Sequence, residues 1–445
     1  MQRDSATAGF RVAAILPDET VPDFRQSYPE AELIELAEEG RVDIAVFPEA
    51  FLAYEYDAGD PSAFPLEHVM GYAELIGIPV LTGAFLGDPV DGRGLRERFE
   101  VALFANPSIA GGNTRGHLYV KHSSAAKKAF EWPGYSGIDD SMYEPIVLGD
   151  KRIGSLVCHD MYYGPLCRNQ VKRGANVLLD LTGGGVDEGK WRTVAATRSV
   201  DYDCPFLVTM NLRPGKGASI AFAYRNGRDL KPSSTVVGTR GRIEVFDLGD
   251  DGSEMYSPPV ASVTDGKHFK KVLDFSVGSA GALWFDPDAL VYSDGQPAVL
   301  GRWTTLSNGG ESLAVLPLRA PELLDPMYVY RHMPPKGVKH HVLVVVPDPA
   351  GGVDPALLRL VAAGRAIEHL VAVFYADEDG WTCAKVTRYK QPQHVPQRID
   401  GQVTHFRLDA SGGLAGPWLA GGKHPHRGVG SSRDWQSIVY MGAAE

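Results

Sequence analysis

The alternation of apolar, strand-like runs with helical patterns over residues 10–276 is the feature that most restricts the fold of this chain. Three runs in its first part predict buried strands: FRVAAIL at 10–16, VDIAVF at 42–47 and PVLTGAF at 79–85. Two segments between them, residues 29–39 and 64–76, place their apolar residues at helical spacing. Strands that alternate with helices build layered α/β proteins, so we expect an α/β fold rather than an all-α or all-β one.

The pattern changes near residue 280. Residues 283–303 carry many turn-forming residues and little helical periodicity, and residues 340–381 then predict one β-α-β unit. Chains beyond about 250–300 residues usually divide into domains. We therefore expect a first domain at 1–280 and a C-terminal α/β extension at 281–445, and we find no internal repeat in the sequence.

Charge and composition exclude several classes of partner. The 445 residues carry a formal net charge of -11 and no basic stripe, so nucleic acid is not an expected partner. No apolar run approaches the roughly 20 residues that span a bilayer, and the first residues lack the apolar core of a signal peptide, so we expect no membrane association. The four cysteines form no CxxC pair, which favours free thiols and a cytoplasmic location.

Cys158 ends the apolar run IGSLVC, and polar residues follow it directly. A cysteine at such a position is most often a small buried hydrophobic residue, but strand ends also carry the functional groups of α/β proteins. A thiol with an ordinary pKa near ~8.5 needs a neighbouring base or cation to act as a nucleophile. Glu49 and Lys121 each follow another apolar run. Either one alone is typical of a surface residue, but the three together predict a thiol, a base and a cation at strand ends.

These stretches resemble the nitrilase superfamily of carbon–nitrogen hydrolases, whose members carry a Glu-Lys-Cys triad in this chain order. The resemblance covers roughly residues 9–276 and depends on the order and separation of several short motifs. They are the FPE-like Phe47-Pro48-Glu49, the YRK-like Tyr119-Val120-Lys121, Cys158-His159-Asp160 with Arg168, Gly174-Ala175-Asn176 with its apolar run, and then Trp191, Arg198 and Asn211. The pair His159-Asp160 looks more like the amide-cleaving branches than like true nitrilases, which commonly have tryptophan and glutamate after the cysteine.

Two positions need separate comment. Gly164-Pro165 stand where the family usually has proline and glutamate, so this loop is built differently. Many members also have a second active-site glutamate after the lysine. Glu131 is the best match for it as a further catalytic residue, and an ordinary surface residue is the alternative interpretation.

The resemblance implies a four-layer α-β-β-α sandwich, followed by a C-terminal α/β region without an assignable role. It also implies a cysteine-dependent hydrolase that cleaves a carbon–nitrogen bond of a small amide or carbamoyl compound, and less readily of a nitrile, through an acyl-thioester on Cys158. Glu49 would act as base and acid, and Lys121 would stabilise the oxyanion with the backbone N–H of His159. Thr182 would line the pocket. No metal or organic cofactor is implied, and the family's usual assembly predicts a homodimer or larger homo-oligomer.

Two other functions stay open. In an acyltransferase the same thioester would pass to an amine instead of water, and sequence alone does not separate this from hydrolysis. In a catalytically silent binding protein the fold would persist without turnover. The intact trio argues against the silent protein, whereas Gly164-Pro165 and the long C-terminal region argue for it.

Two weaker signals are discounted. The string GGVDEGKW fits the start of a phosphate-binding loop but ends in Trp191 instead of the serine or threonine that holds magnesium. The histidine groups at 340–341 and 424–426 have no second cluster of ligands. We therefore expect neither a nucleotide nor a metal ion.

Overall fold

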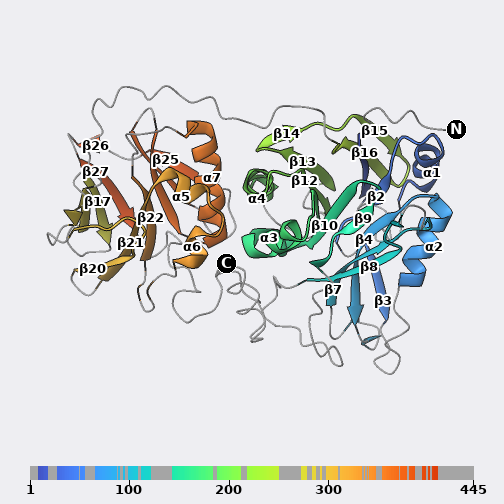
Figure 1. The fold of residues 1–445 in the computed structure, drawn as a ribbon, viewed down its shortest axis with the longest axis horizontal. Coiled ribbons are helices and arrows are strands. Elements are labelled where there is room, and N and C mark those ends of the chain that lie inside the picture. Colours follow the sequence, from blue (N-terminus) through green and yellow to red (C-terminus); the bar gives the residue numbers. More distant parts are fainter. Residues whose placement is uncertain are drawn as a thin grey trace. The chain divides into compact units, whose positions relative to one another are not determined.

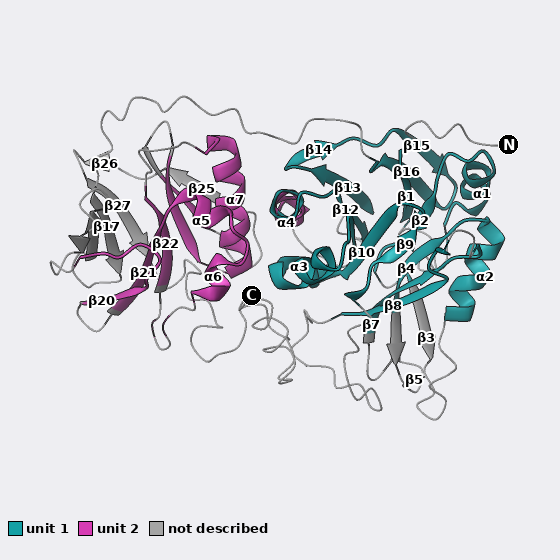
Figure 2. Ribbon diagram, in the orientation of Figure 1, with its two compact units in different colours: residues 1–186, 198–255, 430–438 teal, residues 187–197, 256–429, 439–445 magenta. Residues whose placement is uncertain are grey.

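The structure is a computed structural model in which two units are distinguished (Figure 2). The first comprises Met1–Val186, Arg198–Met255 and Gly430–Ile438, and the second comprises Asp187–Thr197, Tyr256–Val429 and Val439–Glu445. The residues that the structure describes are 9–18, 28–49, 51–55, 66–87, 89–90, 94–95, 99–108, 112–121, 143–183, 188–211, 218–249, 272–277, 283–286, 291–292, 297–308, 311–332, 335, 338, 340–346, 353–369, 371–377, 380–385, 393–396, 399–400 and 403–408.

The first sheet of unit 1 has eight strands in the order β15-β16-β1-β2-β4-β7-β8, with β3 paired to β4 (Figure 1). Strands β1, β2 and β4 run parallel, as expected for strands joined through helices, and β16 and β7 flank them antiparallel. Their bounds are β1 Arg11–Pro17, β2 Ile44–Val46, β3 Leu52–Glu55, β4 Val80–Gly87, β7 Phe99–Ala105, β8 Gly116–Val120, β15 Ser234–Gly238 and β16 Gly241–Asp247; β5 (Pro89–Val90) and β6 (Gly94–Leu95) form a separate two-stranded ribbon.

The second sheet of unit 1 has six strands in the order β14-β13-β12-β11-β10-β9. Strands β10, β11 and β12 are parallel, whereas β9, β13 and β14 extend the sheet antiparallel at its two sides. Helices α3 and α4 connect the parallel strands. The bounds are β9 Ile146–Leu148, β10 Lys151–Val157, α3 Gly164–Lys172, β11 Val177–Gly183, α4 Glu188–Asp201, β12 Phe206–Asn211, β13 Ile220–Arg225 and β14 Arg228–Leu230.

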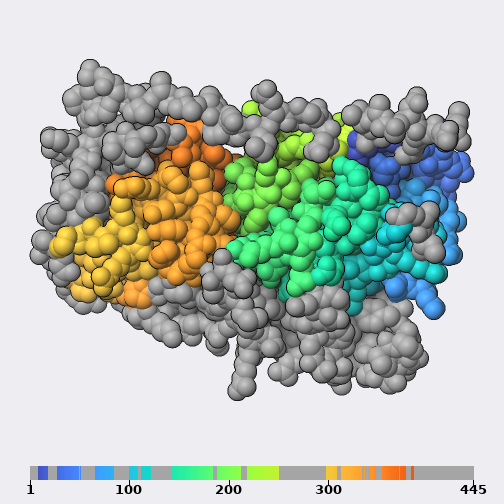
Figure 3. Space-filling model, viewed as in Figure 1, coloured from blue at the N-terminus to red at the C-terminus, as the bar shows by residue number. Residues whose placement is uncertain are grey.

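The two sheets of unit 1 contact each other, β1 with β12 and β13, and β10 with β7 and β8. Helices α1 (Glu30–Glu38) and α2 (Leu66–Ile76) cover the first sheet, and α3 packs on β10 of the second. Alternate residues of β1 divide between two faces, so Ala13 and Ile15 join the core under α1 and α2. Figure 3 shows the described atoms of this unit, blue to yellow-green, packed against one another. The predicted α/β class is confirmed.

Unit 2 contains a second six-stranded sheet, in the order β20-β21-β22-β23-β24-β25, and a five-stranded sheet, β19-β18-β17-β27-β26. In the six-stranded sheet β21, β22 and β23 are parallel, and β20, β24 and β25 extend it antiparallel. The pairing pattern is therefore the same as in the six-stranded sheet of unit 1. The bounds are β17 Val272–Val277, β18 Leu283–Asp286, β19 Val291–Tyr292, β20 Thr304–Asn308, β21 Glu311–Leu318, α5 Ala320–Leu324, α6 Tyr328–Arg331, β22 His340–Val345, α7 Pro355–His369, β23 Ala372–Asp377, β24 Gly380–Lys385, β25 Gln393–Pro396, β26 Ile399–Asp400 and β27 Val403–Leu408.

The predicted domain boundary at 280 falls between β17 and β18, in a segment outside the described residues, and it stays a prediction. Within the described part of the chain, no helix has both the length and the apolar character needed to cross a bilayer.

Glycine at position 154 is required by the packing of α3 on β10. A Cβ on Gly154 would lie 2.2 Å from Oε1 of Gln170 and 2.6 Å from Cδ2 of Leu178, whereas a Cβ on Gly71 in α2 would meet no atom within 4 Å. We expect Gly154→Ala to lower the free energy of unfolding by about 1–3 kcal/mol through overpacking. Gly71→Ala should raise it by up to ~1 kcal/mol through helix propensity. Urea unfolding of both variants measures the difference, and equal effects would contradict the packing.

Candidate active site

Cys158 lies where β10 ends and a short 3-10 helix, η4 (Cys158–Tyr162), begins. Its φ angle is 55°, in the left-handed region, and its side chain is buried. A non-glycine residue in that region costs on the order of 1–3 kcal/mol and persists only where its surroundings enforce it. Residues with such strained backbone cluster at active sites, ligand clamps and switch regions.

Glu49 and Lys121 form a buried ion pair. Lys121 directly follows β8, Glu49 lies three residues after the end of β2, and Nζ of Lys121 is 2.7 Å from Oε1 of Glu49. The two side chains are only 4% and 6% exposed. At this burial the ammonium and carboxylate are largely deprived of water, so each depends on the other and on further partners for its charge.

Glu100 is a second carboxylate on Lys121 that the sequence analysis missed. Its carboxylate accepts a hydrogen bond from Nζ of Lys121, and its backbone oxygen accepts one from the Lys121 N–H at 2.9 Å. The register of β7 and β8, in which Val101 pairs with Val120, places Glu100 opposite Lys121. Because β7 and β8 are consecutive in the sequence, pairing them as an antiparallel hairpin would have placed Glu100 opposite Lys121 and revealed this contact.

The carboxylate of Glu49, which follows a strand of the first sheet, lies at the edge of the second sheet, where β10 and β11 end and where Cys158 is found. Val157 pairs with Leu181 in parallel register, so Cys158 and Gly183 follow at neighbouring strand ends. A Cβ on Gly183 would lie 3.2 Å from Oε2 of Glu49, so the carboxylate packs directly against this strand end. Cys158 interacts electrostatically with both Glu49 and Lys121. The three predicted catalytic side chains are therefore gathered by two different sheets.

Burial sets the proton affinity of the carboxylate and the thiol. It raises the pKa of Glu49 to about 8; Lys121 opposes this increase and Glu100 reinforces it. Burial also raises the pKa of the Cys158 thiol well above its ordinary value, with Glu49 adding to the rise and Lys121 opposing it. At neutral pH the resting site therefore favours a protonated thiol beside a carboxyl group of unusually high basicity.

Lys121 keeps its charge. Burial on its own lowers the pKa of the Lys121 ammonium, but the attraction of Cys158, Glu49 and Glu100 outweighs burial and raises the pKa well above its ordinary value. The site thus holds one permanent cation, and any negative charge that develops next to it is stabilised without a proton transfer from Lys121.

The residues that follow the cysteine tie η4 to both sheets. The hydroxyl of Tyr119, on β8, donates to Oδ2 of Asp160 at 2.8 Å. The residue before α3, Tyr163, makes no side-chain capping bond. The side chain of Asp160 is thus tied to β8, a strand of the other sheet.

The other predicted site residues have different surroundings. Nδ1 of His159 lies 3.9 Å from Sγ of Cys158, and the His159 ring contacts Tyr162 edge to face. Thr182 is buried, and its hydroxyl donates to Asp180, another buried carboxyl whose pKa burial raises well above its ordinary value. Glu131 lies outside the described residues. The described residues contain no group of three or more histidine, cysteine, aspartate or glutamate side chains that could hold a metal ion.

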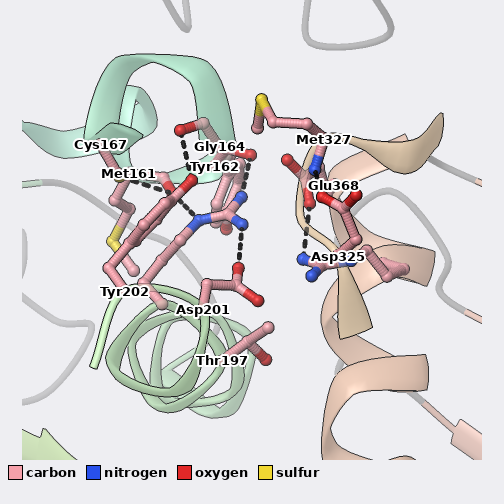
Figure 4. Close-up of polar contacts among 12 residues, drawn as sticks. Met161, Tyr162, Gly164, Cys167, Thr197, Asp201, Tyr202, Asp325, Met327 and Glu368 are labelled. Atoms are coloured by element: carbon pink, nitrogen blue, oxygen red, sulfur yellow. Dashed lines mark hydrogen bonds and ion pairs between the residues drawn. The ribbon is translucent and has the colours of Figure 1, made fainter. Parts of the chain in front are cut away.

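The remaining motif residues differ in burial. Trp191, Arg198 and Asn211 are buried, whereas Gly174 and Asn176 are exposed. The cysteines Cys167 and Cys204 are buried as well. Figure 4 shows Asp201 and the backbone oxygens of Met161 and Tyr162 directed at one guanidinium group, that of Arg198.

Comparison with known proteins gives structural neighbours only. No family model matches the sequence, and no curated protein matches it either. The neighbours include a carbon–nitrogen hydrolase from Helicobacter pylori G27, with 17% identity and a TM-score of 0.38 over 54% of this chain and 90% of that one. A nitrilase-superfamily amidase from Nesterenkonia sp. AN1 has 18% identity and a TM-score of 0.36 over 55% and 93%.

A variant of that amidase carries the acetamide moiety of fluoroacetamide on its active-site cysteine; it has 20% identity and a TM-score of 0.37 over 54% of this chain and 91% of that one. The neighbours belong to the family that the sequence motifs resemble. These similarities are weak, so function is inferred below from the side chains of the site.

The left-handed backbone at Cys158 has a measurable consequence. Glycine adopts this conformation freely, whereas alanine retains the strain, so Cys158→Gly should unfold with a free energy about 1 kcal/mol higher than that of Cys158→Ala. The order should reverse at Cys204, which is equally buried but has no positive φ. Chemical denaturation of the four variants tests this, and the same order at both positions would rule out strain at Cys158.

Proposed function

We propose that this protein is a cysteine-dependent hydrolase that cleaves the carbon–nitrogen bond of a small amide or carbamoyl compound, and less readily of a nitrile, through an acyl-thioester on Cys158. The observation that supports this most is the buried Glu49–Lys121 pair at 2.7 Å beside a strained cysteine at a strand end. A merely structural cysteine has no need of an adjacent base and a fixed cation.

The first half of the reaction forms the thioester. Glu49 accepts the proton of the Cys158 thiol as sulfur attacks the carbonyl carbon, which gives a tetrahedral oxyanion. Lys121 and the backbone N–H of His159 stabilise that oxyanion; one such donor contributes on the order of 3 kcal/mol. The carbon–nitrogen bond then breaks, and Glu49 returns the proton to the leaving nitrogen, so ammonia or an amine departs.

The second half releases the acid. Glu49, again ionised, accepts a proton from water as the water oxygen attacks the thioester carbon. The second tetrahedral oxyanion is held by Lys121, and it collapses with loss of the thiolate, which takes the proton back from Glu49. Glu49 carries out every proton transfer of the reaction. Its pKa of about 8 suits this role, because a general acid and base is most effective when its pKa lies near the pH at which it acts.

Several parts of the proposal come from the sequence alone. Glu131 is proposed as a second carboxylate of the site and Thr182 as a residue that lines it. We also propose a cytoplasmic location, a homodimer or larger homo-oligomer, and a hydrolase domain that ends near residue 280 with a C-terminal extension of unassigned role.

An acyl adduct on Cys158 tests the chemistry directly. We expect intact-mass analysis of the protein with a library of small aliphatic amides to show a mass increase of one acyl group, and peptide mapping to place it on Cys158. Cys158→Ala should stay folded and form no adduct. Cys204→Ala, which removes another buried thiol, should behave as the wild type. No adduct and no ammonia from any amide, with the protein folded, would contradict the proposal.

Two substitutions separate the roles of base and cation. Glu49→Gln should lower kcat/KM by roughly 10²–10⁴-fold because the general base is lost. Lys121→Met should lower it by roughly 10²–10³-fold because the oxyanion loses its charged donor. Ammonia release without an added amine acceptor is the measurement. Near-normal rates in either variant would remove that residue from the mechanism.

The pH profile should report the titration of Glu49. The base is active only when ionised, so kcat/KM should rise with pH through about 8 and fall about tenfold for each unit below that value. Lys121 stays charged over this range because its pKa is raised. Rates of ammonia release between pH 5.5 and 9.5 test the prediction, and a half-maximum near the ordinary pKa of glutamate would show that the carboxyl group is not the buried one.

A further inference from the structure

A guanidinium clamp holds the turn that follows Cys158. Nε of Arg198 donates to the backbone oxygen of Met161 at 2.9 Å and Nη2 to that of Tyr162 at 2.6 Å. Nη1 donates to Oδ2 of Asp201, three residues later on α4, at 2.7 Å. The side chains of Arg198 and Asp201 are 1% and 0% exposed, so the clamp is dry and its hydrogen bonds are charge-assisted.

Unit 2 contains the same clamp. Nε of Arg365 donates to the backbone oxygen of Leu323 at 3.2 Å and Nη2 to that of Leu324 at 3.4 Å. Nη1 donates to Oε2 of Glu368, three residues later on α7, at 3.2 Å (Figure 4). The same three nitrogen atoms therefore serve two successive carbonyl groups and one carboxylate in both units.

The elements around the two clamps also correspond. In each six-stranded sheet, a connection of two helices joins the first two parallel strands, short η4 and then α3 in unit 1 and short α5 and then α6 in unit 2. One long helix joins the second and third parallel strands, and two antiparallel strands follow. The clamping arginine is on the long helix, α4 or α7, and the two carbonyl groups are on the fourth and fifth residues of the short one, η4 or α5. Both long helices share the pattern A-A-x-R-x-[V/I]-[D/E], at residues 195–201 and 362–368.

The correspondence assigns Ala320 to the position of Cys158, since each is the first residue of its five-residue short helix. Ala320 has no thiol, and its φ is not among the positive ones found in the described residues. The cysteine of unit 2 in the described part, Cys383, lies on β24. Unit 2 thus keeps the clamp, but the first residue of its clamped helix, Ala320, carries neither a thiol nor a positive φ.

We propose that Arg198 is a positioning residue for Cys158, that unit 2 repeats the clamped half of unit 1 without a nucleophile, and that all thiol chemistry belongs to unit 1. The link to catalysis depends on the proposed function, but the mechanical claim does not. By fixing the backbone oxygens of Met161 and Tyr162, the clamp holds the far end of η4, while β10 holds the near end. A left-handed residue between two fixed ends cannot relax without moving one of them.

Lysine is the informative substitution at both clamps. It retains the charge and the pairing with Asp201 or Glu368, but a single ammonium does not reproduce a planar fork that reaches two carbonyl groups and a carboxylate. Arg198→Lys therefore loosens the turn after Cys158 and leaves the helix in place. Arg365→Lys makes the same chemical change at the matched position without a thiol, and so it serves as the control.

The experiment compares wild type, Arg198→Lys and Arg365→Lys in the full chain by two readouts. One is amide hydrogen exchange in peptides that cover residues 158–166 and 320–328. The other is the iodoacetamide alkylation rate of Cys158 by mass spectrometry, with Cys204 as internal reference. Arg198→Lys should speed exchange in 158–166 and slow alkylation of Cys158 by roughly tenfold to a hundredfold, as small misplacements of a reacting group do. Arg365→Lys should speed exchange in 320–328 alone and leave Cys158 alkylation unchanged.

Each outcome is decisive. Unchanged exchange in 158–166 in folded Arg198→Lys, or equal loss of Cys158 alkylation in both variants, overturns the inference. If Arg198→Lys does not fold, Asp201→Asn keeps the guanidinium but removes its orienting charge, and the same readouts apply. Wild-type Cys158 that alkylates no faster than Cys204 would count against the proposed function. In that case, amide hydrogen exchange in residues 158–166 alone would decide whether the clamp fixes the turn.

Discussion

The buried contact between Lys121 and Glu49 is the interaction on which the candidate site depends. Removing an ammonium and a carboxylate from water costs several kcal/mol per ion, and their mutual attraction often fails to offset this. A chain selected for stability alone could replace such a pair with apolar side chains of similar volume. Its presence at the edge of two sheets, with Glu100 as a second carboxylate, is therefore better explained by chemistry than by stability. Burial, with a smaller contribution from Glu100, raises the pKa of Glu49, and the surrounding negative groups raise the pKa of Lys121 and keep it charged.

The sheets supply the convergence that this chemistry needs. Glu49 and Lys121 follow strands of one sheet, whereas Cys158 follows β10 and Gly183 ends β11 of the other, and the two sheets are in contact. A parallel sheet places the ends of its strands together at one edge, so groups far apart in the chain meet there. The hydroxyl of Tyr119, on β8 of the first sheet, donates to Asp160, two residues after Cys158. A small number of contacts at strand ends thus hold Glu49, Lys121 and Cys158 in place.

The sequence predicted the α/β class from its alternating strand-like and helical runs. It made Glu49, Lys121 and Cys158 the candidate residues because each ends an apolar run and their order resembles that of the nitrilase triad. It did not reveal Glu100, which required the register of β7 against β8, or the left-handed φ at Cys158, which no pattern of side chains encodes. Nor did it reveal the hydrogen bond between Tyr119 and Asp160, which joins residues 41 positions apart in the chain. The correspondence between the units was missed for a similar reason. The pattern that the two long helices share covers only seven residues and has no periodicity. The correspondence between the units therefore becomes visible in the strand pairing of their sheets.

The two arginine clamps separate what belongs to the fold from what belongs to the site. A buried guanidinium that satisfies two carbonyl groups and a carboxylate solves a general problem, since the end of a short helix leaves backbone oxygens without partners in a dry interior. Both units use that solution, with Asp201 in one and Glu368 in the other. Only in unit 1 does the clamped helix begin with a thiol in a strained conformation. Under the proposed function, catalysis is therefore not a property of the repeated architecture but of three side chains of unit 1, Glu49, Lys121 and Cys158.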